Sequence, residues 1–151
     1  SFWTELQKQC SKYNIIICPK VRMEDFIEVN VKDYKTKESW RGKIKSRHID
    51  FILCDINLKI IAAIELDDCS HQSPAAKKTD QFKNDVLYTI GIPLHRVNVD
   101  NGNFKQNIEL ILHQLGYHPK DKPLNKNIDI QENKEATNNP NKTGIFSGTN
   151  I

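Results

Sequence analysis

Two acidic residues lie within apolar, strand-like segments of the sequence. Asp50 stands between Ile49 and Phe51, and Glu65 interrupts the apolar run Ile60–Leu66. Burying an ionised carboxylate without a partner costs several kcal/mol. Mg²⁺ and Mn²⁺ are held by one or two protein carboxylates, with water and substrate phosphate as the other ligands. A cation bound in this way activates a water molecule and neutralises charge that develops on a phosphodiester. We therefore expect Asp50 and Glu65 to hold Mg²⁺ or Mn²⁺.

Further polar residues follow Glu65 closely and would lie near the same edge of a sheet. Asp67 comes directly after Leu66, His71 is in the next loop and Asp80 is on the next expected helix. The alternative is a solvent-exposed strand end, at which acidic residues simply face water. Because so many such side chains gather at one edge, we favour a functional site.

The pattern of apolar residues places Asp50 and Glu65 opposite each other. The segments His48–Cys54 and Lys59–Leu66 are predicted to be strands, and the turn near Asn57 is short enough for an antiparallel hairpin. Counted from that turn, the two carboxylates reach the same level on the two strands. Like charges this close repel, so without a metal at least one of the two carboxyl groups should have a raised pKa.

The remaining elements predict an α/β fold with a mixed β-sheet flanked by helices. Apolar periodicity predicts further helices and strands at Phe2–Lys12, Ile15–Cys18, Ala75–Ile90, Leu94–Val99 and Phe104–Leu115. The order is therefore αβββαβ, followed by a closing helix. The helix between Leu66 and Leu94 is a crossover, so the strands that it connects should be parallel neighbours. The segment Arg22–Glu38 has no sustained period and is expected to be a loop with room for one helical turn.

Composition divides the chain into a folded part and a polar tail. With 38% hydrophobic and 27% charged residues, the chain is typical of a soluble globular protein, which we expect in the cytoplasm. Residues 1–118 would form one domain, and residues 119–151, rich in Asn, Lys and Thr, are predicted to be a disordered tail. The cysteines lack zinc-binding spacing and are expected to be free thiols. The chain begins at Ser1, next to the first expected helix, as a fragment of a longer protein would.

Basic residues are concentrated between Lys32 and Arg47. This stretch contains 7 lysines and arginines against 2 acidic residues, with Tyr34 and Trp40 among them. Cations interspersed with aromatic residues are typical of nucleic-acid-binding surfaces, although a solvated loop can have the same composition. We expect binding to DNA, with RNA as an alternative, through Lys43, Lys45, Arg47, Lys77 and Lys78.

Several stretches of the sequence resemble a known family. They are His48-Ile49-Asp50-Phe51, Ile64-Glu65-Leu66-Asp67-Asp68 with His71, Asp80-Gln81-Phe82-Lys83-Asn84-Asp85, and Gly91-Ile92-Pro93-Leu94-His95-Arg96. From about Phe2 to Val99 the chain resembles an uncharacterised bacterial family, domain of unknown function 2726. That family is placed in the PD-(D/E)XK, or restriction-endonuclease-like, nuclease superfamily, near the very-short-patch repair endonucleases. The resemblance implies the restriction-endonuclease-like αβββαβ core and a metal-dependent DNA nuclease.

The resemblance also implies roles for individual residues. Asp50 matches the aspartate of the first acidic motif and Glu65 matches the acid of (D/E)-x-K, so both would be metal ligands. Asp67 stands where that motif has a lysine, which would polarise the attacking water or stabilise the charged transition state. Lys83, one turn from Asp80 on the next helix, is the candidate replacement. The alternative is that Lys83 is an ordinary exposed helix lysine.

Two further residues have competing interpretations. His71 resembles histidines that act as general base or support a metal ligand in the repair-endonuclease branch, but it could equally order the turn at Asp67-Asp68. Arg96 could contact phosphate, or it could form an ion pair with Asp67 or Asp80 that holds the sheet edge together.

The expected function is hydrolysis of DNA phosphodiester bonds by a metal-activated water. One alternative is a non-catalytic nucleic-acid-binding module that retains the nuclease fold but has lost activity together with the motif lysine. Another is a protein-interaction domain in which the acidic residues form an ion-pair network.

Overall fold

The computed structural model describes residues 1–68, 74–118, 144–149 and 151. These residues form a four-stranded sheet in the order β1-β3-β4-β5 and a two-stranded sheet of β2 and β6. The helices and strands are α1 (Phe2–Cys10), β1 (Ile16–Arg22), β2 (Ile27–Val29), α2 (Tyr34–Lys45), β3 (His48–Cys54), β4 (Ile60–Asp67), α3 (Pro74–Thr89), β5 (Leu94–Asn98), α4 (Phe104–Gln114) and β6 (Phe146–Gly148). Short 3₁₀ turns follow α1 at Ser11–Tyr13 and β1 at Met23–Asp25.

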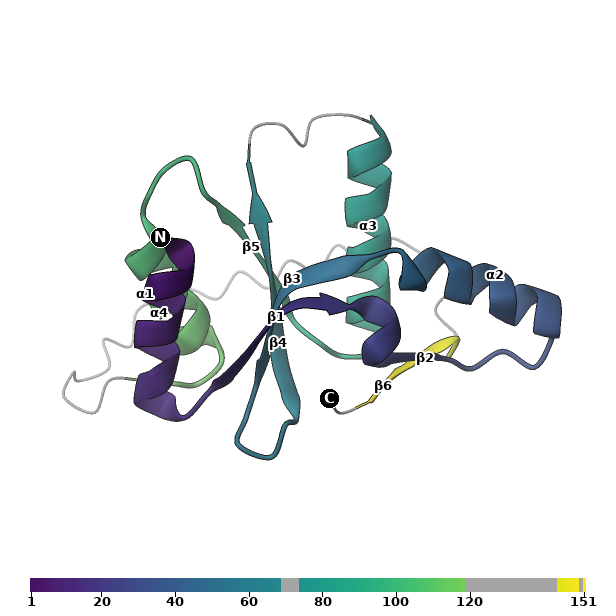
Figure 1. Cartoon of the computed structure of the whole chain (residues 1–151), viewed down its shortest axis with the longest axis horizontal. Coiled ribbons are helices and arrows are strands. Elements are labelled where there is room, and N and C mark those ends of the chain that lie inside the picture. Colours follow the sequence, from purple (N-terminus) through teal and green to yellow (C-terminus); the bar gives the residue numbers. More distant parts are fainter. Residues whose placement is uncertain (69–73, 119–143, 150) are drawn as a thin grey trace.

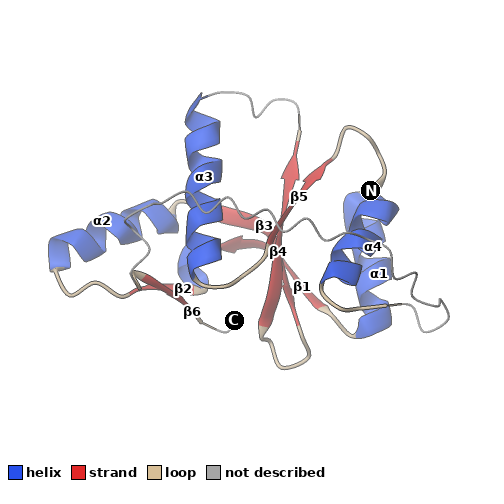
Figure 2. Ribbon diagram, turned by 180° about the vertical axis from the view of Figure 1, so that it is seen from behind, coloured by secondary structure: helices blue, strands red, loops and turns tan. Residues whose placement is uncertain are grey.

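The four-stranded sheet lies between two groups of helices (Figures 1 and 2). α1 and α4 pack together on one face, and α3 covers the other. α2 is on the same side as α3 and extends away from the sheet, next to the small sheet of β2 and β6. The structure is therefore mixed α/β, with a sheet of mixed strand orientation flanked by helices, as the sequence predicts.

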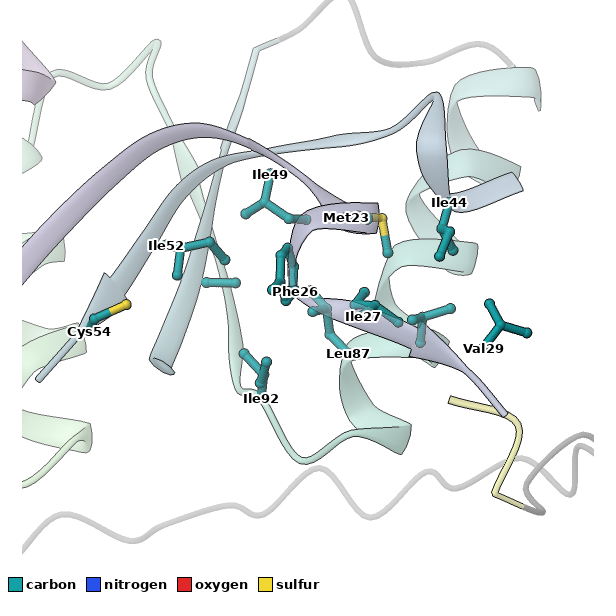
Figure 3. Close-up of a cluster of buried hydrophobic side chains, with 12 residues drawn as sticks. Met23, Phe26, Ile27, Val29, Ile44, Ile49, Ile52, Cys54, Leu87 and Ile92 are labelled. Atoms are coloured by element: carbon teal, nitrogen blue, oxygen red, sulfur yellow. The ribbon is translucent and has the colours of Figure 1, made fainter. Parts of the chain in front are cut away.

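Each face of the large sheet has its own hydrophobic core. Figure 3 shows the core on the α3 side, in which Phe26 lies between the sheet and Leu87 of α3. The buried residues of the other core come from α1, α4 and the sheet; they include Phe2, Leu6, Cys10, Leu53, Ile64, Val97, Ile108 and Leu112. The helical periodicity of the sequence identified these inward faces correctly, because both α1 and α4 present apolar residues every three or four positions.

The strand pairing agrees with the sequence interpretation. β3 and β4 form an antiparallel hairpin in which Phe51 pairs with Ile64 and Ile52 pairs with Ala63. β4 and β5 are parallel neighbours connected through α3, and Glu65 pairs with Arg96. Both predictions depended on loop length: a short turn permits only an antiparallel pair, and a crossover helix allows a parallel one.

The segment Arg22–Glu38, expected to be a loop with room for one helical turn, instead contains β2 and the beginning of α2, which continues to Lys45. Asp33 caps α2, because its side chain accepts a hydrogen bond from the Thr36 N–H (2.8 Å). The Thr36 hydrogen bonds lower the pKa of Asp33, as expected for a capping carboxylate. Ile44 is the one fully buried residue of the helix, and Trp40, one turn earlier, is packed against the same core. With so few apolar positions, α2 has almost no periodicity by which it could be recognised.

β1 continues beyond the expected strand Ile15–Cys18 and ends at Arg22. Pro19 was expected to end it, but Pro19 pairs with Phe51 and the ladder with β3 resumes at Val21. β1 is an edge strand of the sheet, where the missing N–H of a proline leaves no hydrogen bond unmade. Between these pairs Lys20 adopts a left-handed backbone conformation, with φ of 53°.

The prediction of a disordered tail is wrong for residues 144–149. β6 pairs antiparallel with β2, and the pairing extends to hydrogen bonds from Asn30 N–H to the Ile145 carbonyl (2.6 Å) and from Thr149 N–H to the Phe26 carbonyl (2.8 Å). The Phe146 ring packs edge-on against Trp40, with centroids 5.3 Å apart. Isolated apolar residues near the end of the tail thus cover a buried strand that pairs with no other strand in the described part of the chain. Residues 119–143 lie outside the described part.

No helix in the described part of the chain is long and apolar enough to cross a membrane. Cys10, Cys18 and Cys54 are free, as expected, and Cys69 lies outside the described residues. Burial raises the pKa of Cys10 to about 12. Burial, together with the neighbouring Cys18 and Asp55, raises the pKa of Cys54 to about 12. Neither of these two thiols is therefore a reactive thiolate.

Candidate functional site

Asp50 and Glu65 meet where β3 and β4 continue beyond their last paired residues, Phe51 and Ile64. The Asp50 N–H donates to Glu65 Oε1 (3.2 Å), and the Leu66 N–H donates to Asp50 Oδ2 (2.9 Å). At this level the two side chains therefore replace the backbone hydrogen bonds of the ladder. The sequence prediction that these carboxylates lie at one level on adjacent strands is confirmed.

Glu65 is stabilised by a lysine of the helix that covers the sheet. Its relative exposure is 6%, and Glu65 Oε2 lies 2.7 Å from Lys83 Nζ. The Lys83 side chain is itself only 12% exposed. An acid can occupy this apolar strand because α3 brings an ammonium group to it. Lys83 is therefore not an ordinary exposed helix lysine.

Asp50 has a cationic partner of its own, Lys20, which sequence reasoning missed. Lys20 of β1 forms an ion pair with Asp50 Oδ1, and the Lys20 side chain is 74% exposed. No local pattern in the sequence signals this contact, because it depends on the left-handed backbone at Lys20 and on pairing between distant strands.

The charges around Asp50 lower its pKa. Burial by itself would raise the pKa of this carboxyl, but the hydrogen bonds from Lys20 and the Leu66 N–H, with the charges of Lys20 and Lys83, lower the pKa below its usual value. The raised pKa expected from like-charge repulsion is thus not found at Asp50. The two lysines and the Leu66 N–H explain the difference.

Arg96 of β5 forms the edge of the site. Its guanidinium lies 3.0 Å from Asp67 Oδ1 and 3.3 Å from Asp80 Oδ1, and it also donates to Asn84 Oδ1 (3.3 Å). Of the two interpretations of Arg96, the structure shows the ion pair, and with both predicted acids at once. These contacts tie the end of β4 and the middle of β5 to α3, and they fix the helix that holds Lys83.

The predicted nucleic-acid contacts lie on two helices of the same side. Lys43 and Lys45 are exposed on α2, and Lys77 and Lys78 are exposed near the start of α3. Arg47 differs: its guanidinium lies over the Phe82 ring, 4.5 Å from the centroid, and its buried Nε has no hydrogen-bond partner in the described part. Arg47 thus joins the end of α2 to α3. His71 lies outside the described residues.

The two carboxylates are suited to a hard cation but do not form a closed cage. Among the described residues there is no group of three or more His, Cys, Asp and Glu side chains that could hold a metal ion. Mg²⁺ usually takes one or two carboxylates and completes its shell with water and substrate phosphate. Asp50 and Glu65 match that smaller requirement.

Comparison with known proteins gives one result. No curated protein and no solved structure matches the chain at a significant level. One family matches residues 1–115, which include α1 to α4 and every described residue of the site. Its description is "Protein of unknown function (DUF2726)". The chain therefore belongs to the DUF2726 family.

Proposed function

We propose that this protein is a metal-dependent nuclease that hydrolyses phosphodiester bonds of DNA. The observation that carries the proposal is the arrangement of Asp50, Glu65 and Lys83. Two adjacent carboxylates, one of them 2.7 Å from a nearly buried ammonium group, project from neighbouring strands. A hydrolase acting on phosphodiesters needs oxygen ligands for a divalent cation and a fixed positive charge at the reacting phosphate.

Each residue would have a defined role. Asp50 and Glu65 would hold Mg²⁺ or Mn²⁺, which supplies charge neutralisation and lowers the pKa of a water molecule. Lys83 supplies the cation that the sequence lacks at Asp67, and it comes from α3 instead of β4. Asp67 is paired with Arg96 and would contribute by fixing the position of α3.

The order of elements supports placing the fold in the restriction-endonuclease-like class. α1, β1, β3, β4, α3 and β5 follow the αβββαβ order of that core, with β3 and β4 antiparallel and β4 and β5 parallel. β2 and α2 would then be an insertion between the first two core strands. The proposed site lies on the α3 side of the sheet.

Exposed lysines on α2 and α3 support DNA as the substrate. Lys43, Lys45, Lys77 and Lys78 are exposed on α2 and α3. Contacts from such side chains to phosphate release counterions, which favours any polyanion irrespective of its sequence. RNA would satisfy the same electrostatic requirement.

Incubation with supercoiled and single-stranded DNA in Mg²⁺, Mn²⁺ or chelator tests the proposal. Metal-dependent cleavage by the wild-type chain, with loss of cleavage in Asp50→Asn and Lys83→Met, is the expected result. Arg22→Met is a suitable control, because Arg22 pairs with Asp25 and takes no part in the site.

A second candidate function is a nucleic-acid-binding module without catalytic activity. The observation that favours it is that each of the two carboxylates already forms an ion pair with a lysine. The negative charges of Asp50 and Glu65 are therefore compensated without a metal. DNA binding with no cleavage under any metal would support this module over the nuclease.

A further inference from the structure

The two carboxylates of the site each have one fixed oxygen and one oxygen bound to a lysine. Asp50 Oδ2 accepts a hydrogen bond from the backbone N–H of Leu66 on β4, and Glu65 Oε1 accepts one from the backbone N–H of Asp50 on β3. Asp50 Oδ1 and Glu65 Oε2 instead face Lys20 and Lys83. The oxygens that could coordinate a divalent cation are therefore the two that form ion pairs with lysines.

The two lysines differ greatly in how easily they could leave. Lys83 is 12% exposed and its partner Glu65 is similarly buried, so separating them would leave buried charges without partners. Lys20 is 74% exposed, and its ammonium group can exchange Asp50 for water at little cost. Asp50 Oδ1 is thus the carboxylate oxygen that is most easily freed to coordinate a divalent cation.

The backbone conformation of Lys20 indicates that its ion pair with Asp50 has a functional role. Its φ of 53° lies in the left-handed region, which residues other than glycine and asparagine rarely adopt. Both neighbours remain paired with β3, Pro19 with Phe51 and Val21 with Ile49, so the irregularity is confined to the residue that faces Asp50. Strained residues of this kind are concentrated at functional sites.

We infer that Lys20 is the exchangeable cation of the site, which holds Asp50 in the metal-free protein and must release it before a divalent cation binds. This inference rests on the proposed function, because it assumes that Asp50 is a metal ligand. Lys20 thereby acts as a positioning residue that orients the Asp50 carboxylate. It also competes directly with the metal, so that metal affinity is lower than the two carboxylates alone would provide.

The test is a titration of the full chain with Mn²⁺ in the absence of DNA, followed by thermal unfolding and by calorimetry. Lys20→Met keeps most of the side chain but removes its charge, and should lower the half-saturating Mn²⁺ concentration at least threefold. Lys20→Arg keeps the charge and should remain near the wild type. Arg22→Met, two residues further along β1, removes a charge that pairs with Asp25 and should change the midpoint much less than Lys20→Met.

A second variant covers the case in which Lys20→Met does not fold. Lys20→Gly suits the left-handed backbone and also removes the charge, so it should bind Mn²⁺ more tightly as well. If wild type binds Mn²⁺ and the uncharged Lys20 variants bind it equally or more weakly, the inference fails and the proposed function survives. If neither wild type nor variants bind Mn²⁺, both fail. Binding by the variants alone would support the inference.

Discussion

Lys83 of α3 and Glu65 of β4 form an ion pair in which Nζ and Oε2 are 2.7 Å apart and both side chains are nearly buried. The pair connects the helix to the sheet at the level of Asp50, whose N–H donates to the other oxygen of Glu65. A buried charge that keeps its partner contributes little net stability, but one that loses its partner is strongly destabilising.

Lys83→Met should therefore lower the free energy of unfolding by about 3–5 kcal/mol, because Glu65 is left charged and buried. Glu65→Gln combined with Lys83→Met should be less destabilised than Lys83→Met alone, since no buried charge remains. Urea unfolding at neutral pH measures both. Lys105→Met is the matched control, because its exposed pair with Glu109 spans 3.9 Å and should contribute less than about 1 kcal/mol. Equal losses for Lys83→Met and Lys105→Met would contradict this account.

Asp50→Asn should lower stability by about 1 kcal/mol at pH 7, because it removes the ion pair with Lys20 while the amide oxygen can still accept from Leu66. The folded pKa of Asp50 is lowered, so its contribution exists above its unfolded value near pH 4 and is lost as the pH falls through the folded pKa. The difference between wild type and variant should thus shrink on acidification. Chemical unfolding at several pH values measures it, and a difference independent of pH would argue against this role.

Truncation after Lys120 should destabilise the fold, since it removes β6 and exposes β2. Phe146→Ala should reproduce part of the loss, about 1 kcal/mol for the aromatic pair with Trp40 together with its buried area, or roughly 4 °C in the melting temperature. Tyr34→Ala, at an exposed position on α2, serves as the control. Unchanged melting of the truncated chain would show that β6 adds nothing to stability.

DNA affinity should fall steeply with salt if the exposed lysines of α2 contact phosphate. Replacing Lys43 and Lys45 by Ala should reduce the slope of log affinity against log salt by about 2, whatever the DNA sequence. Fluorescence anisotropy across a salt series measures this slope. Lys59→Ala, in the turn between β3 and β4, should leave it unchanged.

Arg47→Ala should act mainly on stability. The guanidinium lies over Phe82 and its Nη1 donates to the Lys43 carbonyl, so the variant loses the connection between α2 and α3. We expect a loss of about 1–2 kcal/mol, typical of a cation–π contact that is partly shielded from solvent. A variant of unchanged stability but weakened DNA binding would instead make Arg47 a phosphate contact.

The elements with a clear apolar period were predictable, and so was the part of the site that they position. The hairpin of β3 and β4 follows from its short turn, and it brings Asp50 to Glu65. Once α3 is recognised as a crossover helix, it must cover the sheet next to β4, which makes Lys83 and Asp80 natural neighbours of the acids.

The remaining features depend on contacts between distant residues that leave no local pattern. α2 has one fully buried residue, so its period is hidden among charged side chains. Lys20 meets Asp50 through a left-handed backbone that nothing in Pro19-Lys20-Val21 signals. β6 is three residues long and owes its structure to the partner strand β2, not to its own composition.

The pairing of β2 with β6 also affects how the chain folds while it is being made. Asn30 Nδ2 donates to Ser147 Oγ (2.9 Å) across 117 positions of sequence. At about 5–20 residues per second of synthesis, β2 would wait roughly 6–23 s for this partner. During that interval Ile27 and Val29 belong to a strand with an open edge, which can pair with a neighbouring chain. Nascent chains should therefore be most prone to aggregation just before residues 146–148 emerge from the ribosome.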